Sequence, residues 1–216
     1  WYGVRNLVTQ VVMDETLQTD SMAYWFCSMT QLSDLSAAFI PDGCEDVRHL
    51  LRSSAISTLP ESFILPESVR NASGMFESCV KLESLPDGFT LQGADGSGIP
   101  GADCAKVFSG CTSLSSLPEG FALPGGLSLA SAFERCWSLT SLPASISPIP
   151  ASATDISRMF YDLPSLRILP AGFDFPTSAI GASSPELLGL PAERDVIATY
   201  CTDPSADLQS WFAAHS

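Results

Sequence analysis

The sequence predicts an α/β fold in which about six short coils stack into one right-handed solenoid across all 216 residues. Two observations predict it. One pattern returns six times at intervals of roughly 25 residues. Each copy joins a segment of helical apolar spacing to a short Leu-x-x-Leu-Pro segment. A unit of that length cannot bury its apolar face alone, so neighbouring copies must share a continuous core.

The copies align on one aromatic or leucine residue at the head of each unit, here termed the anchor. Nine residues after every anchor stands a leucine, and ten residues after it stands a proline in five of the six units, with Ser36 as the exception. Residue types that recur in this way fill the same slot in successive coils. The anchors, at intervals of 24, 26, 32, 25 and 27 residues, are Phe26, Leu50, Phe76, Phe108, Phe133 and Phe160.

The segment around each anchor is predicted to be a short helix. In the fifth unit, Leu129, Phe133 and Cys136 fall at positions i, i+4 and i+7, which places one apolar stripe on one side of a helix. Asp155 or Thr154 is positioned to cap the helix of the sixth unit.

The Leu-x-x-Leu-Pro segment predicts a strand of three or four residues that ends at the proline, because proline cannot donate to a sheet. Passing from a strand through a turn and a helix to a parallel strand is a crossover, and such crossovers are right-handed in nearly all proteins. We therefore expect a short parallel sheet on one face of the solenoid and short helices on the other.

The ends of the chain and one insertion depart from the repeat. We expect a single domain, with an N-terminal cap over 1–21, repeats over 22–180 and a C-terminal cap over 181–216. Because the chain begins at Trp1 rather than at a methionine, we expect it to be a fragment. The insertion over 92–103 contains a G-x-G-x-x-G match at 96–101, the fingerprint of dinucleotide binding. No apolar strand precedes the match and Pro100 lies inside it, so we expect a loop that binds neither nucleotide nor metal.

The charge of the chain argues against some classes of partner. Charged residues are 16% of the sequence, the net charge is −14, and the ten Lys and Arg residues are scattered. Nucleic acids and anionic membrane surfaces are bound through basic patches, so we expect neither as a partner. No apolar run approaches the roughly 18 residues of a membrane-spanning helix, so we expect no membrane insertion.

Three of the seven cysteines, Cys79, Cys111 and Cys136, share one slot, three residues after the anchor. A cysteine in a repeated inward slot behaves as a small buried hydrophobe, so we expect these thiols to be reduced and unreactive. The sequence leaves open whether Cys27 and Cys44 form a disulfide.

No catalytic motif is present. The two histidines, His49 and His215, stand in no nucleophile-like or metal-ligand context, and H-E-x-x-H, G-x-S-x-G and C-x-x-C are missing from the sequence. The acidic residues of LPDGF and LPEGF recur as turn residues. We therefore predict a protein that is not an enzyme and that has no cofactor and no metal.

The unit MF-x-x-C-x-x-L-x-x-LP, followed by GF-x-LP, resembles the BspA-like leucine-rich-repeat surface proteins of bacteria, and so do the opening VVMDETLQTDSMAYWFCSMTQL and the closing TYCTDPSADLQSWFA. The resemblance implies a leucine-rich-repeat-type solenoid that is secreted or attached to the cell surface, with a role in adhesion or protein binding. Two units depart from the pattern, with Ser53 and Leu163 in the cysteine slot. The family contributes no catalytic residues.

The exposed face of the predicted sheet is the expected contact surface. Seven residues after the anchors comes a row of mostly Ser and Thr residues with two charged exceptions. The predicted contact residues are Glu83, Ser115, Thr140 and Arg167, and we expect a monomer whose ligand is an extracellular or host protein. The alternative is a passive spacer. An exposed aromatic or strongly charged patch favours binding, whereas a uniform Ser/Thr face favours the spacer.

Overall fold

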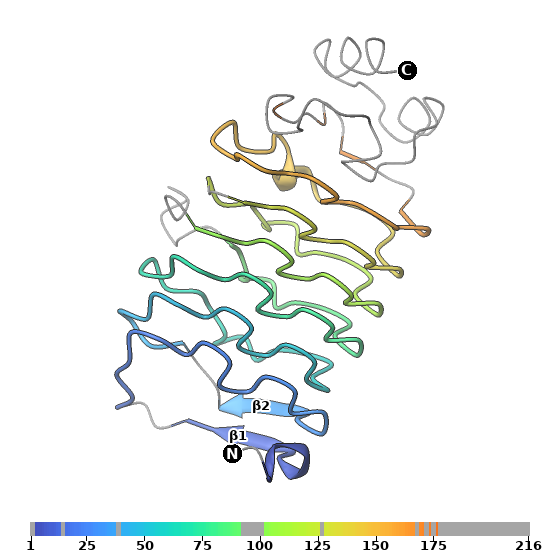
Figure 1. The fold of residues 1–216 in the computed structure, drawn as a ribbon. Helices are drawn as coiled ribbons and strands as arrows, with labels where there is room; N and C mark the ends of the chain where they lie inside the picture. Colours follow the sequence, from blue (N-terminus) through green and yellow to red (C-terminus); the bar gives the residue numbers. More distant parts are fainter. Residues whose placement is uncertain are drawn as a thin grey trace.

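The computed structural model describes residues 3–13, 16–37, 40–91, 102–125, 128–166, 169–170, 173 and 176. Within them the chain runs through successive coils that stack one on another, from the blue N-terminal end to the orange end of Figure 1. One apolar core extends along the stack from Met22 to Phe173. The predicted C-terminal cap over 181–216, the G-x-G-x-x-G match and Arg167 all lie outside the described residues.

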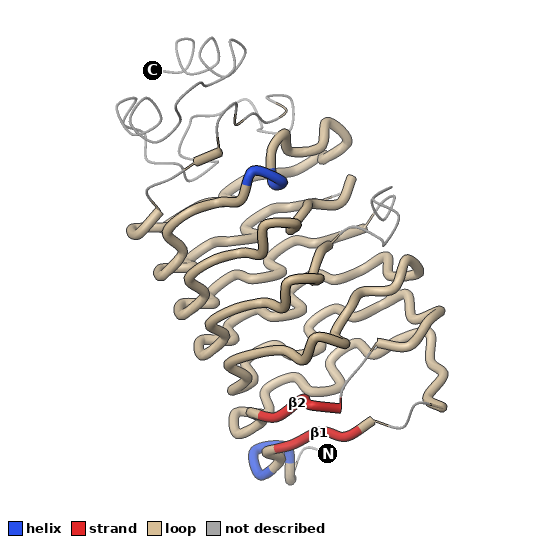
Figure 2. Tube along the Cα trace, turned by 180° about the vertical axis from the view of Figure 1, so that it is seen from behind, coloured by secondary structure: helices blue, strands red, loops and turns tan. Residues whose placement is uncertain are grey.

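Regular secondary structure in the described residues is sparse. A 3-10 helix η1 (Arg5–Leu7) precedes strand β1 (Gln10–Val12), which pairs in parallel with β2 (Asp34–Ala37). A second 3-10 helix, η2 (Ala144–Ile146), lies in the fifth unit. Figure 2 shows the two strands in red at one end of the stack and the loops of the remaining coils in tan.

Proline explains why the predicted parallel sheet stops after two strands. Strand β2 belongs to the unit in which Ser36 replaces the recurrent proline, so its main chain keeps the donor that a ladder needs. The following units carry Pro60, Pro86, Pro118 and Pro143 at that position. On this face neighbouring coils are joined by single main-chain hydrogen bonds, such as Ser115 N–H to the Glu83 carbonyl at 3.2 Å. The rest of the face is therefore extended loop rather than sheet.

The prediction of a short helix at each anchor is wrong for every unit described. In the fourth unit, alternate N–H groups donate to the next coil: Phe108 donates to the carbonyl of Ala132 at 2.9 Å and Gly110 to that of Glu134 at 2.7 Å. The intervening N–H groups donate three residues back within the same coil, as Cys111 does to Phe108 at 3.0 Å. We call this run of consecutive turns, bonded both within and between coils, the turn ladder.

The turn ladder imitates the apolar period of a helix. Its alternating partners require a left-handed backbone at two residues per coil, four positions apart, such as Lys106 at φ 57° and Gly110 at φ 75°. Its buried residues still fall at i, i+3, i+4 and i+7, the spacing of a helical stripe. Hydrophobic period alone therefore could not separate the two structures. In the third unit the buried set is Ala72, Met75, Phe76 and Cys79.

The anchor of the second unit is Leu51, not Leu50. Parallel bridges join equivalent residues of the six units, each five positions before its anchor: Ser21, Asp46, Asn71, Asp103, Ser128 and Asp155. This register gives intervals of 25, 25, 32, 25 and 27 residues between anchors. Ser54 rather than Ser53 then takes the cysteine slot, and the second unit is one residue shorter before Ile56. Adjacent leucines that are both fully buried concealed this deletion.

The bridged residues form a polar column that begins each turn ladder. Each side chain accepts the N–H group two residues further on, at distances from 2.9 to 3.3 Å. Asp155, the predicted helix cap, makes this bond with Ser157 at 2.9 Å, but turns follow it rather than a helix. Ser, Asn and Asp suit the column because their short side chains reach their own backbone.

Removing one member of the polar column should cost about 1 kcal/mol of unfolding free energy, the usual loss for a side-chain cap. Asn71→Ala removes the acceptor for both the N–H and the hydroxyl of Ser73, at 3.0 and 2.8 Å. Asn71→Asp should be nearly neutral, because Asp46 and Asp103 hold the neighbouring positions. Urea unfolding of the three proteins measures both effects, and equal stability of the alanine variant and the parent would contradict this role.

Two columns of aromatic rings fill the core. The anchor rings of Phe76, Phe108, Phe133 and Phe160 stack with centroids 5.4 to 5.8 Å apart and planes within 14° of parallel. A second column, twelve residues after Leu51 and thirteen residues after the other anchors, packs against the first with ring centroids 5.9 to 6.3 Å apart. The second column comprises Phe63, Phe89, Phe121, Ile146 and Phe173.

Candidate binding surfaces

Three of the predicted contact residues lie side by side on the loop face that carries β1 and β2. Glu83, Ser115 and Thr140 are exposed, and their coils are joined in sequence by the bonds Ser115 N–H to Glu83 carbonyl and Thr140 N–H to Ser115 carbonyl. We call these residues the polar row. The fourth, Arg167, is outside the described part of the chain.

The hydroxyl groups of the polar row are directed back to the main chain. Ser115 Oγ donates to the Glu83 carbonyl and Thr140 Oγ1 to the Ser115 carbonyl, each at 3.4 Å. Just below the row, Ser138 Oγ donates to the Thr112 carbonyl at 2.7 Å. These hydrogen bonds join neighbouring coils. They also occupy hydroxyl donors that would otherwise be available to a ligand.

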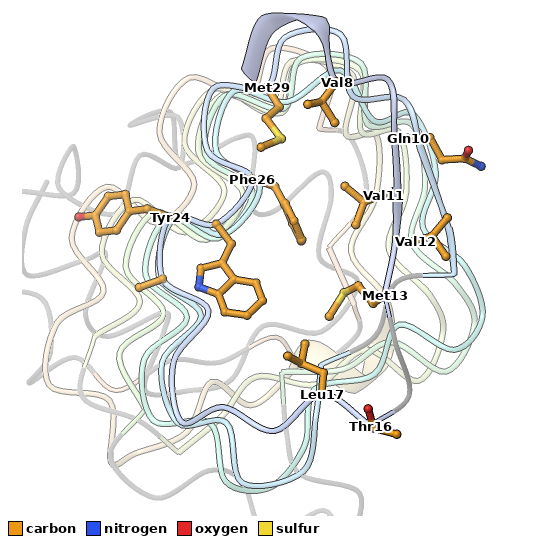
Figure 3. Close-up of a pocket in the computed structure, with 12 residues that line it drawn as sticks. Val8, Gln10, Val11, Val12, Met13, Thr16, Leu17, Tyr24, Phe26 and Met29 are labelled. Carbon is orange, nitrogen blue, oxygen red and sulfur yellow. The ribbon is translucent and has the colours of Figure 1, made fainter. Parts of the chain in front are cut away.

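Exposed aromatic side chains gather on the opposite side, in the turn ladder. Figure 3 looks along the stack and places Gln10 of β1 on one side and Tyr24 on the other. The exposed aromatic side chains on the outer side of the ladder, within the described residues, are Tyr24, Trp137 and Tyr161. Trp25 is also exposed, but it borders the hollow at the N-terminal end of the stack. Sequence reasoning missed this surface because it assigned the ladder to helices and placed the contact surface on the opposite, sheet face.

The fifth and sixth units carry the densest group, which we call the aromatic patch: Glu134, Arg135, Trp137, Arg158, Tyr161 and Asp162. Trp137 Nε1 donates to Asp162 Oδ2 at 3.1 Å, and Arg135 Nε lies 3.9 Å from the same oxygen. The guanidinium of Arg158 lies 4.0 Å from the centroid of the Tyr161 ring. The two rings therefore stand on a scaffold of ion pairs and hydrogen bonds.

Cations dominate the exposed charge of this patch. Arg158 Nη2 pairs with Glu134 Oε1 at 2.7 Å, and the Glu134 side chain is only 12% exposed whereas that of Arg158 is 45% exposed. Arg135 is also well exposed. The Glu134 carboxylate thus lies beneath its arginine, and the outer layer consists of the two arginines, the two rings and Asp162, which is 45% exposed.

A second group lies near the N-terminal end of the same face. The His49 ring packs against Tyr24, with centroids 5.0 Å apart, and sits directly over Gly74, where a Cβ atom would lie 2.4 Å from its Nδ1 atom. Glu77 Oε2 lies 3.0 Å from Arg52 Nε and 3.4 Å from His49 Nδ1. His49 is therefore a packed member of the ladder, and with Glu77 it belongs to no group of three or more His, Cys, Asp or Glu side chains that could hold a metal ion in the described residues.

The buried thiols act as hydrogen-bond donors between coils. The Sγ atoms of Cys79, Cys111 and Cys136 donate to the carbonyls of Leu51, Phe76 and Phe108, the anchors of the preceding coils, at 3.0 to 3.2 Å. Burial raises the pKa of Cys79 to about 11 and that of Cys136 to about 12, and it raises the pKa of Cys111 well above its ordinary value. All six described cysteines are free, Cys27 and Cys44 among them, so the structure contains no bond between this pair.

The raised thiol pKa values predict a loss of stability at alkaline pH. A thiol with a higher pKa in the folded than in the unfolded protein stabilises the folded state. This contribution to the free energy of unfolding is complete below the unfolded-state pKa and decreases as the pH rises above that value. Between the ordinary value of 9.0 and about 11 for Cys79, each such thiol should remove about 1.4 kcal/mol per pH unit. Unfolding free energies from pH 8 to 11 test this.

Cys111→Ser provides the matched control, because Ser54 already occupies the same slot in the second coil. This variant should show a shallower alkaline slope. In the native parent protein all three thiols should react with a thiol reagent only after unfolding. Rapid labelling of the folded protein, or an unchanged slope in the serine variant, would contradict the buried-donor role.

Two further classes of site are absent from the described residues. They contain no group of three or more His, Cys, Asp or Glu side chains arranged to hold a metal ion. Within the same residues, no helix is long and apolar enough to cross a membrane.

Comparison with known proteins gives structural matches alone. No family model matches the chain, and no curated protein matches it. The structure is similar to that of a leucine-rich repeat protein from Bacteroides ovatus ATCC 8483, with 16% identity and a TM-score of 0.36 over 78% of this chain and 47% of that protein. A leucine rich cell surface protein from Faecalibacterium prausnitzii A2-165 matches with 15% identity and a TM-score of 0.17, over 83% of this chain and 78% of that one. The chain spans about half the length of the Bacteroides protein. Both of these proteins are leucine rich and come from bacteria.

Proposed function

We propose that this chain is a non-catalytic binding module of a bacterial cell-surface protein, with another protein as its ligand. The observation that supports binding over a spacer role is the aromatic patch. Trp, Tyr and Arg are the residues most enriched where protein interfaces derive their affinity. Here Trp137, Tyr161 and two arginines stand together on one exposed face. Secretion, adhesion and a host ligand are part of the same proposal.

Two surfaces compete for the contact. The polar row, to which the sequence pattern adds Arg167, is the surface that the sequence favours, since it aligns side chains from successive coils. The aromatic patch has the composition of an interface core. The hydroxyl groups of the polar row, in contrast, already donate hydrogen bonds to main-chain carbonyls. Because the two surfaces face opposite ways, one small ligand domain contacts one of them. We assign the contact to the aromatic patch.

A passive spacer is the second candidate. The bonded Ser/Thr hydroxyls of the polar row favour it, because a surface that satisfies its own polar groups offers little to a partner. In that case the aromatic patch would serve only to pack neighbouring coils.

The test is a binding screen of the purified chain against extracellular-matrix and mucosal proteins, repeated with two matched double variants. Trp137→Ala with Tyr161→Ala should weaken binding at least about tenfold, equivalent to about 1.4 kcal/mol. Exchanging the charges of the row, Glu83→Arg with Arg167→Glu, should leave the affinity within about threefold, since surface charges at a rim contribute little. The melting temperature of each variant controls for folding.

The reverse pattern would move the contact to the polar row and overturn the assignment to the patch. The absence of any partner at roughly 100 μM, a concentration at which even weak complexes form, would leave the spacer as the function.

A further inference from the structure

The first coil leaves open a core slot that every other described coil closes. The residue just before the anchor is fully buried in the second to sixth units, where it is Leu50, Met75, Val107, Ala132 and Met159. In the first unit this residue is Trp25, which is 41% exposed. The neighbouring anchor Phe26 is only partly buried, whereas Phe76 and Phe108 are fully buried.

These side chains line a hollow of about 1000 Å³ at the N-terminal end of the stack. Figure 3 shows Val11, Met13, Leu17, Phe26 and Met29 directed into its interior. The lining is almost entirely apolar, like the interior of the coils that follow. Water in contact with such a surface is unfavourable, so the hollow is a place where apolar side chains from another segment would be buried.

The backbone of the same coil presents hydrogen-bond acceptors without donors. At each of the five junctions between coils, four carbonyls of the turn ladder accept N–H groups from the preceding coil at 2.7 to 3.0 Å. The equivalent carbonyls of the first coil belong to Ser21, Ala23, Trp25 and Cys27. Thr19 Oγ1 donates to the Ser21 carbonyl at 2.9 Å, but the other three have no hydrogen-bond partner among the described residues.

On the β1 side of the N-terminal end, main-chain groups and apolar side chains also lack partners among the described residues. Within the described part of the chain, strand β1 pairs with β2 alone, so its other edge has no partner strand there. Val4, Leu7 and Val12, beside that edge, are 49%, 76% and 71% exposed. The sixth coil differs, because its core residues Ile156, Met159 and Phe160 are fully buried.

We propose that the N-terminal end of the stack is a joint that receives one more coil of the same polypeptide, from the part of the protein that precedes Trp1. The missing partner must offer N–H groups at every second residue and apolar side chains for the hollow, and a coil with this repeat's turn ladder offers both. The geometry of the end, rather than the position at which the printed sequence starts, carries this inference.

A second copy of the chain fits this end poorly. Two N-terminal ends placed together would set carbonyl against carbonyl, which leaves both rows unsatisfied. In a head-to-tail pair the N–H groups of the sixth coil would have to meet these carbonyls, but that coil already has a covered core, at Ile156, Met159 and Phe160. A coil in the same chain also avoids the entropic cost of association.

The experiment compares the 216-residue chain with one extended by the natural 30 or so residues upstream, about one repeat unit. The extension should raise the melting temperature by at least about 5 °C and lower the fluorescence of an apolar dye at least about fivefold. An extension with the same residues in scrambled order should do neither.

Trp25→Asp sharpens the comparison. It should shift the melting temperature little in the 216-residue chain, where the slot is open, and much more in the extended chain, where the slot is closed. The proposal is overturned if the natural and scrambled extensions behave alike. It is equally overturned if the 216-residue chain forms a dimer in which Trp25 becomes inaccessible to a fluorescence quencher.

Discussion

Phe108→Ala should lower the free energy of unfolding by about 3–5 kcal/mol, among the largest effects of any single truncation in this chain. The ring is fully buried between Phe76 and Phe133, at centroid distances of 5.4 and 5.7 Å, and it also contacts Phe89 and Phe121 of the second column. Its removal opens a cavity at the centre of the stack that coils on both sides share. Because those coils are held by their own hydrogen-bond ladders, they cannot collapse to fill it.

Phe26→Ala is the matched control for this loss. Phe26 occupies the same slot but borders the open hollow, so it is only partly buried. Its truncation should cost less than half as much. Urea unfolding of both variants measures the difference. Equal losses at the two positions would mean that the core is not continuous along the stack.

Gly74→Ala should cost about 2–4 kcal/mol, the sum of a left-handed backbone penalty and an overpacking penalty. Gly74 has φ 58°, and an added Cβ atom would lie 2.4 and 2.5 Å from two atoms of the His49 ring. His49 cannot move away freely because its other face packs on Tyr24. The equivalent positions of other coils carry Lys106 and Ser131, so only the histidine makes glycine necessary here.

A double-mutant cycle separates the two penalties. Gly74→Ala in a His49→Ala background should lose only about 1 kcal/mol, the backbone part. Gly43→Ala gives that part independently, since Gly43 has φ 87° and no atom within 4 Å of the added Cβ. If the cycle shows no coupling between positions 49 and 74, the His49 ring does not lie over Gly74.

Some features of the fold could be predicted from the sequence and others could not, depending on the role of each position in the repeat. Leu, Phe and Cys recur at core positions because the interior is the same in every coil, and a repeated interior leaves a repeated pattern. The turn ladder escaped prediction because its buried residues have helical spacing, and because its defining hydrogen bonds join residues about 25 positions apart, as Phe108 and Ala132 are. The polar column is visible in the sequence as a Ser, Asp or Asn five residues before each anchor, provided that Leu51 rather than Leu50 is taken as the anchor of the second unit.

The candidate surfaces were predictable to different degrees. The two positions between the leucines of the Leu-x-x-Leu segment were enough to place Glu83, Ser115 and Thr140 on an exposed row. The aromatic patch was not foreseen, because Tyr161 directly follows the buried anchor Phe160 and Trp137 directly follows the buried Cys136. In a helix such neighbours can share a core face, whereas in the ladder Tyr161 and Trp137 are exposed although the residues just before them are buried. Exposure of an aromatic residue therefore depends on the turn geometry that the sequence did not reveal.

Hydrogen-bond scalar couplings measured by NMR on the deuterated chain test the stacked turn ladder most directly. The account predicts that the amide nitrogen of Phe108 couples to the carbonyl carbon of Ala132, and that of Gly110 to the carbonyl carbon of Glu134, across bonds of 2.9 and 2.7 Å. An α-helix would instead couple each nitrogen to the carbonyl four residues back, at Cys104 and Lys106. Couplings to those two residues would contradict the account.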